Sequence, residues 1–265
     1  MNPLATAEPW DLVAPAYTAE ALPDFDVYAR VAIDLAGLPP AARIADVAAG
    51  PGTVSLQAAA RGARVSAIDI SPAMLDELRR RASAAGLADR IEVHLGDAQK
   101  LPFDSAAYDA AFSLFGLMFF PDRHAGLLEM RRVLKAGGRV VISSWVPFVG
   151  PFGELLKVAR ELVPGMPLGG GAPPLGTVEE ITAELGAAGF REVRVERVPH
   201  AVTAASFDAF WDSMQRTSAP VALLRKRLGE RWREAAPAIR ERVRATLDDG
   251  PLTIGRGAFV GLGVA

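Results

Sequence analysis

Short apolar runs alternate with helix-like segments between residues 43 and 145, and this alternation constrains the fold more than any other feature. The strand-like runs are RIADVA, RVSAIDI, RIEVHLGD, YDAAFSLF and AGGRVVISSW, at 43–48, 64–70, 90–97, 108–115 and 136–145. One intervening helix shows a clear start, with Ser71 as N-cap and Pro72 at the first helical position. Parallel strands need crossover connections, which are usually helices. The pattern therefore predicts an α/β fold with a doubly wound, mostly parallel sheet.

The segments outside this region are less regular. We expect a helix over 24–38, a Pro/Gly-rich loop over 163–177, a helix capped by Thr177, strands over 191–198 and 255–265, and helices over 206–249. The two further strands bring the expected sheet to seven. The helical stretch precedes the last strand, so it is predicted to be an insertion near one edge of the sheet.

Composition excludes several classes of protein. The 265 residues are 50% hydrophobic and 23% charged, enough for one large domain or one domain with an insertion. A net charge of -2 gives no reason to expect nucleic acid or an anionic membrane. The absence of cysteine excludes disulfides, thiolate metal sites, iron–sulfur clusters and a cysteine nucleophile, and no metal site is predicted. Without a signal-peptide pattern or a long apolar span, we expect a soluble cytoplasmic protein.

Glycine or polar residues follow four of the predicted strands. They are the turn from Asp46 to Gly52, then Asp69, Asp97 and Ser113. In open α/β sheets, ligands bind beyond the carboxyl ends of the strands, where strand order reverses. These positions therefore predict one ligand site along a single edge of the sheet.

The turn DVAAGPG at 46–52 restricts the choice of ligand. A dinucleotide fingerprint needs a third glycine where this chain has Ser55, and a P-loop needs a lysine that the turn lacks. Asp46 would repel a pyrophosphate and attract an ammonium group, whereas Asp69 suits a ribose hydroxyl. The turn favours a ligand without phosphates.

Four segments, in order, resemble class I S-adenosylmethionine-dependent methyltransferases, and most of all the branch that includes ubiquinone and menaquinone biosynthesis methyltransferases. The segments are RIADVAAGPGTVSL, AIDISPAMLD, GDAQKLPF and YDAAFSLFGLMFFPDRHAGLLEMRRVLKAGGRVVIS. The resemblance covers about residues 40–146. It implies a seven-stranded Rossmann-like fold, S-adenosyl-L-methionine as cofactor and S-adenosyl-L-homocysteine as product. It also implies one domain over 1–265, divided into an N-terminal helical cover (1–40), a cofactor-binding core (41–146), a loop and helix (147–180) and a helical substrate cap (200–250).

The resemblance further implies which residues bind the cofactor. Gly50 and Gly52 would let the backbone approach its methionine part, with Asp46 toward the ammonium group. Ala48 stands where many relatives carry glycine, which slightly narrows the turn. Asp69 would accept both ribose hydroxyls.

The same resemblance implies the contacts of seven more residues. Ile70 and Met74 would enclose the adenine, and Asp97 with the Ala98 backbone would bind its edge. Ser113 and Leu114 would line the methionine end, and Tyr17 would close over the cofactor. Ordinary core packing remains an alternative for Ile70 and Met74, and a surface position remains one for Tyr17.

The chemistry that the resemblance implies needs no compact catalytic triad. A sulfonium is an activated methyl donor, so holding the acceptor close and aligned supplies much of the catalysis. None of His94, His124 and His200 is assigned as a base, and the catalytic residues stay unassigned. LFGLMFF at 114–120 suggests an apolar pocket wall, with a buried strand and helix start as the alternative. We expect a small, partly apolar acceptor, such as a phenol or quinol, methylated at oxygen or carbon.

Two other functions stay open. The segment 223–247 is rich in basic residues: Arg225, Lys226, Arg227, Arg231, Arg233, Arg240, Arg242 and Arg244. It fits a solvated amphipathic helix interrupted by Pro237, but also a surface for RNA or an acidic carrier protein, as in a nucleic-acid methyltransferase. The chain could also be a non-catalytic module that binds S-adenosylmethionine. A nucleic-acid partner is less expected than a small molecule, because the Asp/Asn-Pro-Pro-aromatic turn of amine methyltransferases of DNA is missing.

Overall fold

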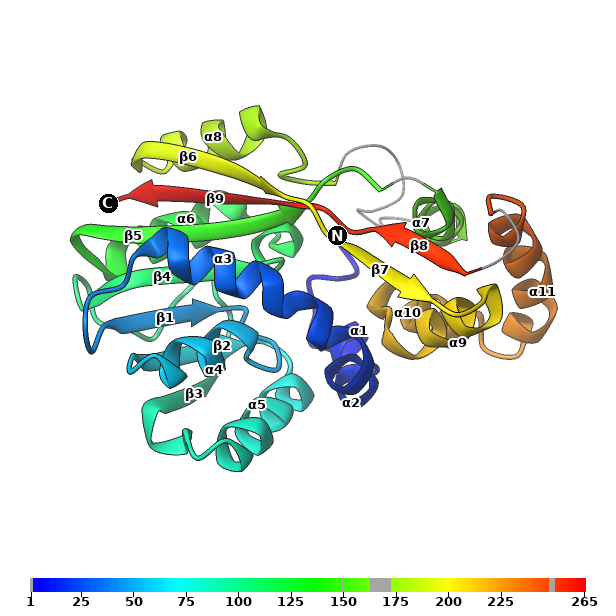
Figure 1. Cartoon of the computed structure of the whole chain (residues 1–265), viewed down its shortest axis with the longest axis horizontal. Coiled ribbons are helices and arrows are strands. Elements are labelled where there is room, and N and C mark those ends of the chain that lie inside the picture. The colour runs from blue at the N-terminus through cyan, green and yellow to red at the C-terminus, as the bar shows by residue number, and fades with distance from the viewer. Residues whose placement is uncertain (1, 149, 163–172, 248–250) are drawn as a thin grey trace.

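The computed structural model describes residues 2–148, 150–162, 173–247 and 251–265. Within these residues seven strands form one sheet in the order β3-β2-β1-β4-β5-β9-β6 (Figure 1). Their bounds are β1 (Arg43–Val47), β2 (Arg64–Asp69), β3 (Ile91–Leu95), β4 (Tyr108–Leu114), β5 (Leu134–Trp145), β6 (Arg191–Val198) and β9 (Ala258–Val264). The first five are parallel, and β9 runs antiparallel to β5 and β6. The predicted doubly wound, mostly parallel seven-stranded sheet is confirmed.

Helices cover both faces of the sheet. The helices α3 (Asp26–Ala36), α4 (Thr53–Ala60) and α5 (Pro72–Ala84) lie on one face, and α6 (Arg123–Val133) and α8 (Val178–Ala187) lie on the other. Successive residues of β1 belong to different layers, since Ile44 packs in the first core and Ala45 in the second. The strands are therefore apolar on both sides, as parallel strands with two covered faces must be.

Helix starts follow the sequence closely because capping is local chemistry. The Ser71 hydroxyl accepts a hydrogen bond from the Met74 amide at 3.1 Å, and the Thr177 hydroxyl accepts one from the Glu180 amide at 3.1 Å. The Asp122 carboxylate accepts the Ala125 amide at 2.9 Å in the same way. These contacts explain why α5, α8 and α6 begin where a Ser, Thr or Asp occurs in the sequence. The expected loop over 163–177 lies mostly outside the described residues.

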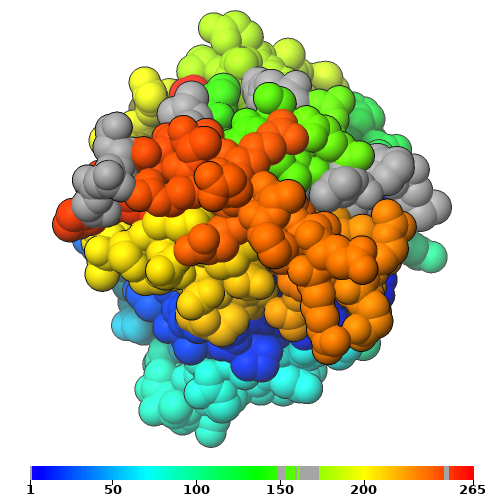
Figure 2. Space-filling view, turned by 90° about the vertical axis from the view of Figure 1, so that its right-hand side faces the viewer, coloured from blue at the N-terminus to red at the C-terminus, as the bar shows by residue number. Residues whose placement is uncertain are grey.

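A second layer of structure, which we call the cap, lies between β6 and β9 in the chain. It consists of α9 (Phe207–Thr217), α10 (Ala219–Leu228), α11 (Arg231–Arg244) and a two-stranded antiparallel ribbon formed by β7 (Ala201–Ala204) and β8 (Leu252–Gly255). The helix α7 (Gly150–Leu162) packs against α10 and α11. Figure 2 shows this end of the molecule, with α7, the cap helices and β8 forming the outer face.

The cap differs from the expectation in two respects. The ribbon was not predicted, because AVTA and LTIG are too short to show a period and pair only with each other. The basic segment was expected to be one helix interrupted at Pro237. It forms two helices instead, which separate at Gly229 with a φ of 54°, and Pro237 lies inside α11. The helix continues through Pro237 because its apolar side, with Trp232, Ile239 and Val243, is buried. No helix in the described ranges is long and apolar enough to cross a bilayer.

The N-terminal segment connects the sheet domain to the cap. It contains α1 (Ala7–Asp11), α2 (Ala14–Ala16), a π-helical turn (Tyr17–Ala21) and a 3₁₀ turn (Leu22–Phe25). Asp11 accepts a hydrogen bond from the Ser71 hydroxyl at 2.6 Å, at the start of α5. On the other side, Glu20 forms an ion pair with Arg216 of α9 at 2.8 Å. The segment therefore holds the cap against the carboxyl edge of the sheet.

Candidate functional site

A cavity of about 310 Å³ lies between the carboxyl ends of the strands, the N-terminal segment and the cap. Ten of the twelve residues predicted to bind the cofactor line it: Tyr17, Asp46, Ala48, Gly50, Asp69, Ile70, Met74, Asp97, Ala98 and Leu114. Gly52 and Ser113 lie outside the lining. Residues from 17 to 114 therefore line one cavity.

The two predicted residues outside the lining have packing environments of their own. Gly52 has a φ of 82°, and a Cβ there would lie 2.0 Å from a methyl carbon of Leu78 on α5. Ser113 is fully buried within β4. The sequence pattern did not distinguish these positions from the lining, because the direction of a side chain depends on the neighbouring helix and strand.

The turn after β1 has a strained backbone that opens toward the cavity. Ala48 and Gly50 have φ values of 57° and 53°, and Phe115 at the end of β4 has a φ of 59°. A left-handed conformation is unusual for alanine and phenylalanine and is concentrated at functional sites. Gly116 lets the two strand ends approach, since a Cβ there would be 2.4 Å from the Ala48 Cβ.

Asp69 connects the turn after β1 to the start of α5. One carboxylate oxygen accepts the Gly50 amide at 2.8 Å and the other accepts the Ser71 amide at 2.8 Å. Burial raises the pKa of Asp69, although these backbone donors oppose that shift. A carboxylate has about four acceptor positions, so Asp69 can hold the turn and still accept hydroxyl donors from a ligand.

Asp46 is anchored by Ser55, the residue that replaces the third glycine of a dinucleotide fingerprint. One oxygen of the Asp46 carboxylate accepts both the Ser55 hydroxyl at 2.6 Å and the Ser55 amide at 3.0 Å. Asp46 is only 2% exposed, and burial raises its pKa to about 6 against the lowering effect of these hydrogen bonds. The sequence pattern showed Ser55 only as the residue in place of a third glycine, and the contact with Asp46 was not predicted. The position of Ser55, third in the helix that follows the turn, is the sequence feature that could have indicated this contact.

The raised pKa of Asp46 predicts a pH dependence of stability. Because the folded-state pKa of about 6 exceeds the ordinary value of 3.8, the folded state binds the proton more tightly between these pH values. The free energy of unfolding should therefore fall by about 3 kcal/mol in total as pH rises through this window. Urea unfolding of Asp46→Asn, which keeps an acceptor for Ser55, should show a flatter pH profile than the wild type. Equal slopes for the two proteins would contradict the assignment.

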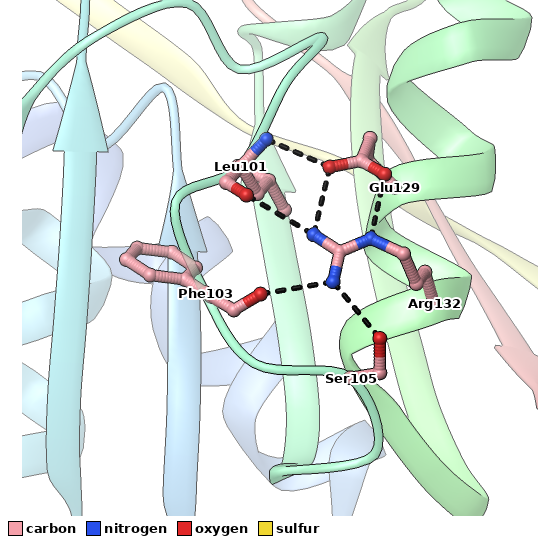
Figure 3. Close-up of polar contacts among 5 residues, drawn as sticks. All are labelled: Leu101, Phe103, Ser105, Glu129 and Arg132. Carbon is pink, nitrogen blue, oxygen red and sulfur yellow. Dashed lines mark hydrogen bonds and ion pairs between the residues drawn. The ribbon is translucent and has the colours of Figure 1, made fainter.

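A side-chain network fixes the loop that begins with Asp97 and Ala98. Arg132 on α6 donates to the carbonyl oxygens of Leu101 at 3.0 Å and Phe103 at 2.9 Å (Figure 3). Glu129, one turn earlier, accepts the Leu101 amide at 2.8 Å and forms an ion pair with Arg132 at 2.7 Å. The hydrogen bond from Arg132 lowers the pKa of Glu129, so the pair stays ionised. The loop is thus held against α6.

Two apolar side chains, Ile70 and Met74, line the cavity beside Asp69 and Asp97 at the ends of β2 and β3. Ile70 is 41% exposed, which leaves its side chain open to a ligand. Met74 is buried and packs with Val13, Ala14 and Ala219. Met74 therefore serves core packing and lines the cavity at once.

Aromatic side chains form the opposite side of the cavity. Phe115 stacks on Trp145 with ring centroids 4.0 Å apart, and Phe25 contacts both edge-on at 5.2 and 5.5 Å. Tyr17 lies 5.5 Å from Phe25, and burial raises the pKa of its hydroxyl. A second contact joins Trp10 and Phe119 at 5.1 Å. Of the segment 114–120, Leu117 and Met118 are buried core as in the alternative, and the other five residues line the cavity together with aromatic side chains from distant segments.

None of the three histidines, all of which lie in described ranges, lines the cavity. His94 packs against Phe103 with centroids 5.1 Å apart, His124 is exposed on α6, and the His200 ring packs edge-on against Tyr28 at 5.5 Å. The histidines thus do not provide a base in direct contact with a ligand in this cavity.

Comparison with known proteins finds methyltransferases among the proteins that part of this chain resembles. The family described as "methyltransferase domain" matches residues 44–138. An uncharacterized protein of Mycobacterium tuberculosis is 37% identical over 139 residues, covering 52% of this chain and 50% of that protein. A demethylmenaquinone methyltransferase of Clavibacter sepedonicus is 47% identical over 114 residues, covering 43% and 45%. The chain thus spans about half the length of the curated relatives it matches.

Solved structures show the same fold at low identity. The YcgJ protein of Bacillus subtilis has a TM-score of 0.60 at 19% identity and covers 89% of this chain and 97% of its own. The [4+2]-cyclase SpnF has a TM-score of 0.61 at 20% identity and covers 97% and 94%. The match of residues 44–138 to the methyltransferase-domain family is consistent with the sheet order and with the fold of these structures.

Proposed function

We propose that this protein transfers a methyl group from S-adenosylmethionine to a small, partly apolar acceptor, at oxygen or carbon. The observation that carries the proposal is a single cavity with an acidic half at the ends of β1, β2 and β3 and an aromatic half beyond β4 and β5. The first half suits a cationic nucleoside, and the second suits the apolar body of an acceptor.

The residues of the acidic half fit the parts of S-adenosylmethionine. Asp69 would accept the ribose hydroxyls while it holds Gly50, and Asp46 would lie toward the ammonium group of the methionine part. Ile70 and Met74 would enclose the adenine, and Asp97 with the Ala98 backbone would bind its edge. Leu114 would face the methionine end and Tyr17 would close the site. The anchoring of Asp46 and Asp69 by protein donors supports these roles, because binding then requires little reordering.

The aromatic half supports displacement at the methyl group. The acceptor atom attacks the methyl carbon in line with the carbon–sulfur bond, whose electron pair returns to sulfur and gives S-adenosylhomocysteine. Phe115, Trp145 and Phe25 would exclude water and fix the acceptor, which lowers the barrier by orientation. A phenol gives up its proton to solvent or to a group of the protein that we leave unassigned.

Two measurements test the proposal. Calorimetry should detect S-adenosylhomocysteine binding, and the wild type should release this product from S-adenosylmethionine with at least one member of a panel of phenols and quinols. Failure to bind either nucleoside would refute the role of the cavity. Binding without product formation from any acceptor would favour the non-catalytic module. The structural neighbour SpnF is named a [4+2]-cyclase, so the shared fold alone does not decide which reaction, if any, follows binding.

The basic segment gives little support to a nucleic-acid substrate. At least four of its eight basic residues pair with carboxylates: Lys226 with Glu8, Arg233 with Glu230, Arg240 with Asp208, and Arg242 with Glu154 and Glu161. Apart from the pair of Arg233 with Glu230, which is local to the start of α11, these pairs connect α10 and α11 to other elements, and all of them reduce the free positive charge. RNA binding that weakens steeply with salt would restore this alternative.

A further inference from the structure

Arg256 places a positive charge inside the aromatic half of the cavity. It lies between β8 and β9, lines the cavity, and its side chain is 11% exposed. Among the lining residues, all of them in described ranges, Arg256 carries the one basic side chain, whereas the acids Asp46, Asp69 and Asp97 lie at the ends of other strands. The cavity is therefore acidic at one end and basic at the other.

The strand order sets the distance between these two ends. Between β1 and β9 lie β4 and β5, and neighbouring strands are about 4.8 Å apart, so the backbone of β9 is about 14 Å from that of β1. Trp145 at the end of β5 pairs with Ala258 at the start of β9. The backbone of Arg256 thus lies beside the end of β5, three strands away from the turn after β1 where the methionine part of the cofactor is expected.

The backbone of Arg256 is fixed independently of its side chain. Its amide donates to the His200 carbonyl oxygen at 2.8 Å, and the Tyr28 hydroxyl donates to its carbonyl oxygen. The guanidinium has Asp24 4.0 Å away, from Nη1 to Oδ2. Burial lowers the pKa of Arg256, but a guanidinium stays charged in proteins. The fold therefore holds a permanent cation at a set position on the cavity wall.

We propose that Arg256 binds a carboxylate on the methyl acceptor, while Phe115 and Trp145 hold the acceptor's apolar body. A guanidinium matches a carboxylate with two parallel hydrogen bonds, and this pairing is stronger in surroundings of low polarity. The proposal rests on the proposed function, because it names the class of acceptor: an aromatic or aliphatic acid rather than a neutral molecule. The methionine carboxylate of the cofactor is the other possible source of the same chemistry, and the experiment separates the two.

The test uses pairs of probes that differ only in charge. With the full-length protein saturated with S-adenosylhomocysteine, calorimetry would compare 4-hydroxycinnamate, 3,4-dihydroxybenzoate and decanoate with their amides. The wild type should bind the acid of at least one pair about tenfold more tightly than the amide. Arg256→Gln should abolish this preference and leave the affinity for S-adenosylhomocysteine within about threefold of the wild type. Arg79→Gln, which changes an exposed arginine on α5, is the matched control and should keep the preference.

The proposal would be overturned if the wild type preferred no acid over its amide, or if the preference for the acid survived in Arg256→Gln. It would also be overturned if Arg256→Gln lost affinity for S-adenosylhomocysteine, because that result would assign Arg256 to the cofactor carboxylate. Thermal unfolding checks that the variant folds, and its backbone hydrogen bonds do not involve the altered side chain. If Arg256→Gln does not fold, salt titration of the wild type decides, since acid binding should weaken with salt and amide binding should not. Failure of the wild type to bind S-adenosylhomocysteine would refute the proposed function itself.

Discussion

Asp69→Ala should weaken S-adenosylhomocysteine binding about 100-fold or more. Asp69 is 8% exposed at the end of β2 and would accept two ribose hydroxyls with a charged acceptor. Each hydrogen bond to a charged group contributes about 1.5–3 kcal/mol, so losing both accounts for an effect of this size. The substitution also removes the acceptor of the Gly50 and Ser71 amides, which loosens the turn that binds the methionine part. Isothermal titration calorimetry measures the change directly.

The control for this experiment is Asp76→Ala on the neighbouring helix α5. Asp76 has a side chain that is 76% exposed and pairs with Arg79, so its loss should leave the affinity for S-adenosylhomocysteine unchanged. An Asp69→Ala protein that folds and binds within about threefold of the wild type would refute the ribose role of Asp69. Asp69→Asn should give an intermediate affinity, because the amide keeps one acceptor oxygen and loses the charge.

Gly52→Ala should destabilise the fold by about 3 kcal/mol. Two effects add: a φ of 82° strains any residue with a Cβ, and the new methyl group would lie 2.0 Å from Leu78 Cδ1 and 3.1 Å from its Cγ. Leu78 is fully buried in the core between α5 and the sheet, so it cannot move aside without disturbing its neighbours. Urea unfolding measures the loss of stability.

Gly62→Ala provides the matched control for backbone strain alone. Gly62 has a φ of 95°, and a methyl group added at its Cα would have no other atom within 4 Å, so the cost should be about 1 kcal/mol. In a Leu78→Ala background, Gly52→Ala should also cost about 1 kcal/mol, because the clashing group is gone. Equal effects of Gly52→Ala in both backgrounds would show that Leu78 is not the cause.

The acidic end of the cavity was predictable because its residues follow a local pattern. Asp46, Asp69 and Asp97 each come at or just after an apolar run, and parallel strands bring their carboxyl ends to the same edge. Helix starts at Ser71 and Thr177 were equally clear, since a cap involves residues only three positions apart.

The packing within that edge needed the structure. Nothing in the sequence separates Gly50, which lines the cavity, from Gly52, which packs on Leu78. The difference arises because Leu78 lies on another helix, and its position depends on how α5 packs on the sheet. The position of Ser55 after the turn allows a contact with Asp46, but only the folded turn and α4 bring its hydroxyl to the carboxylate.

The resemblance to class I S-adenosylmethionine-dependent methyltransferases suggested the cofactor, and the sequence by itself determined the fold class and the sheet edge that carries the candidate site. These depend on periodic burial and short-range signals, which neighbouring residues encode. Only the tertiary structure decided the composition of the acceptor side, where Phe25, Phe115, Trp145 and Arg256 meet. Those residues lie up to 231 positions apart (256 minus 25), and no local pattern fixes which of them meet. Their contacts result from the antiparallel return of β9 beside β5 and from the N-terminal segment packing over both.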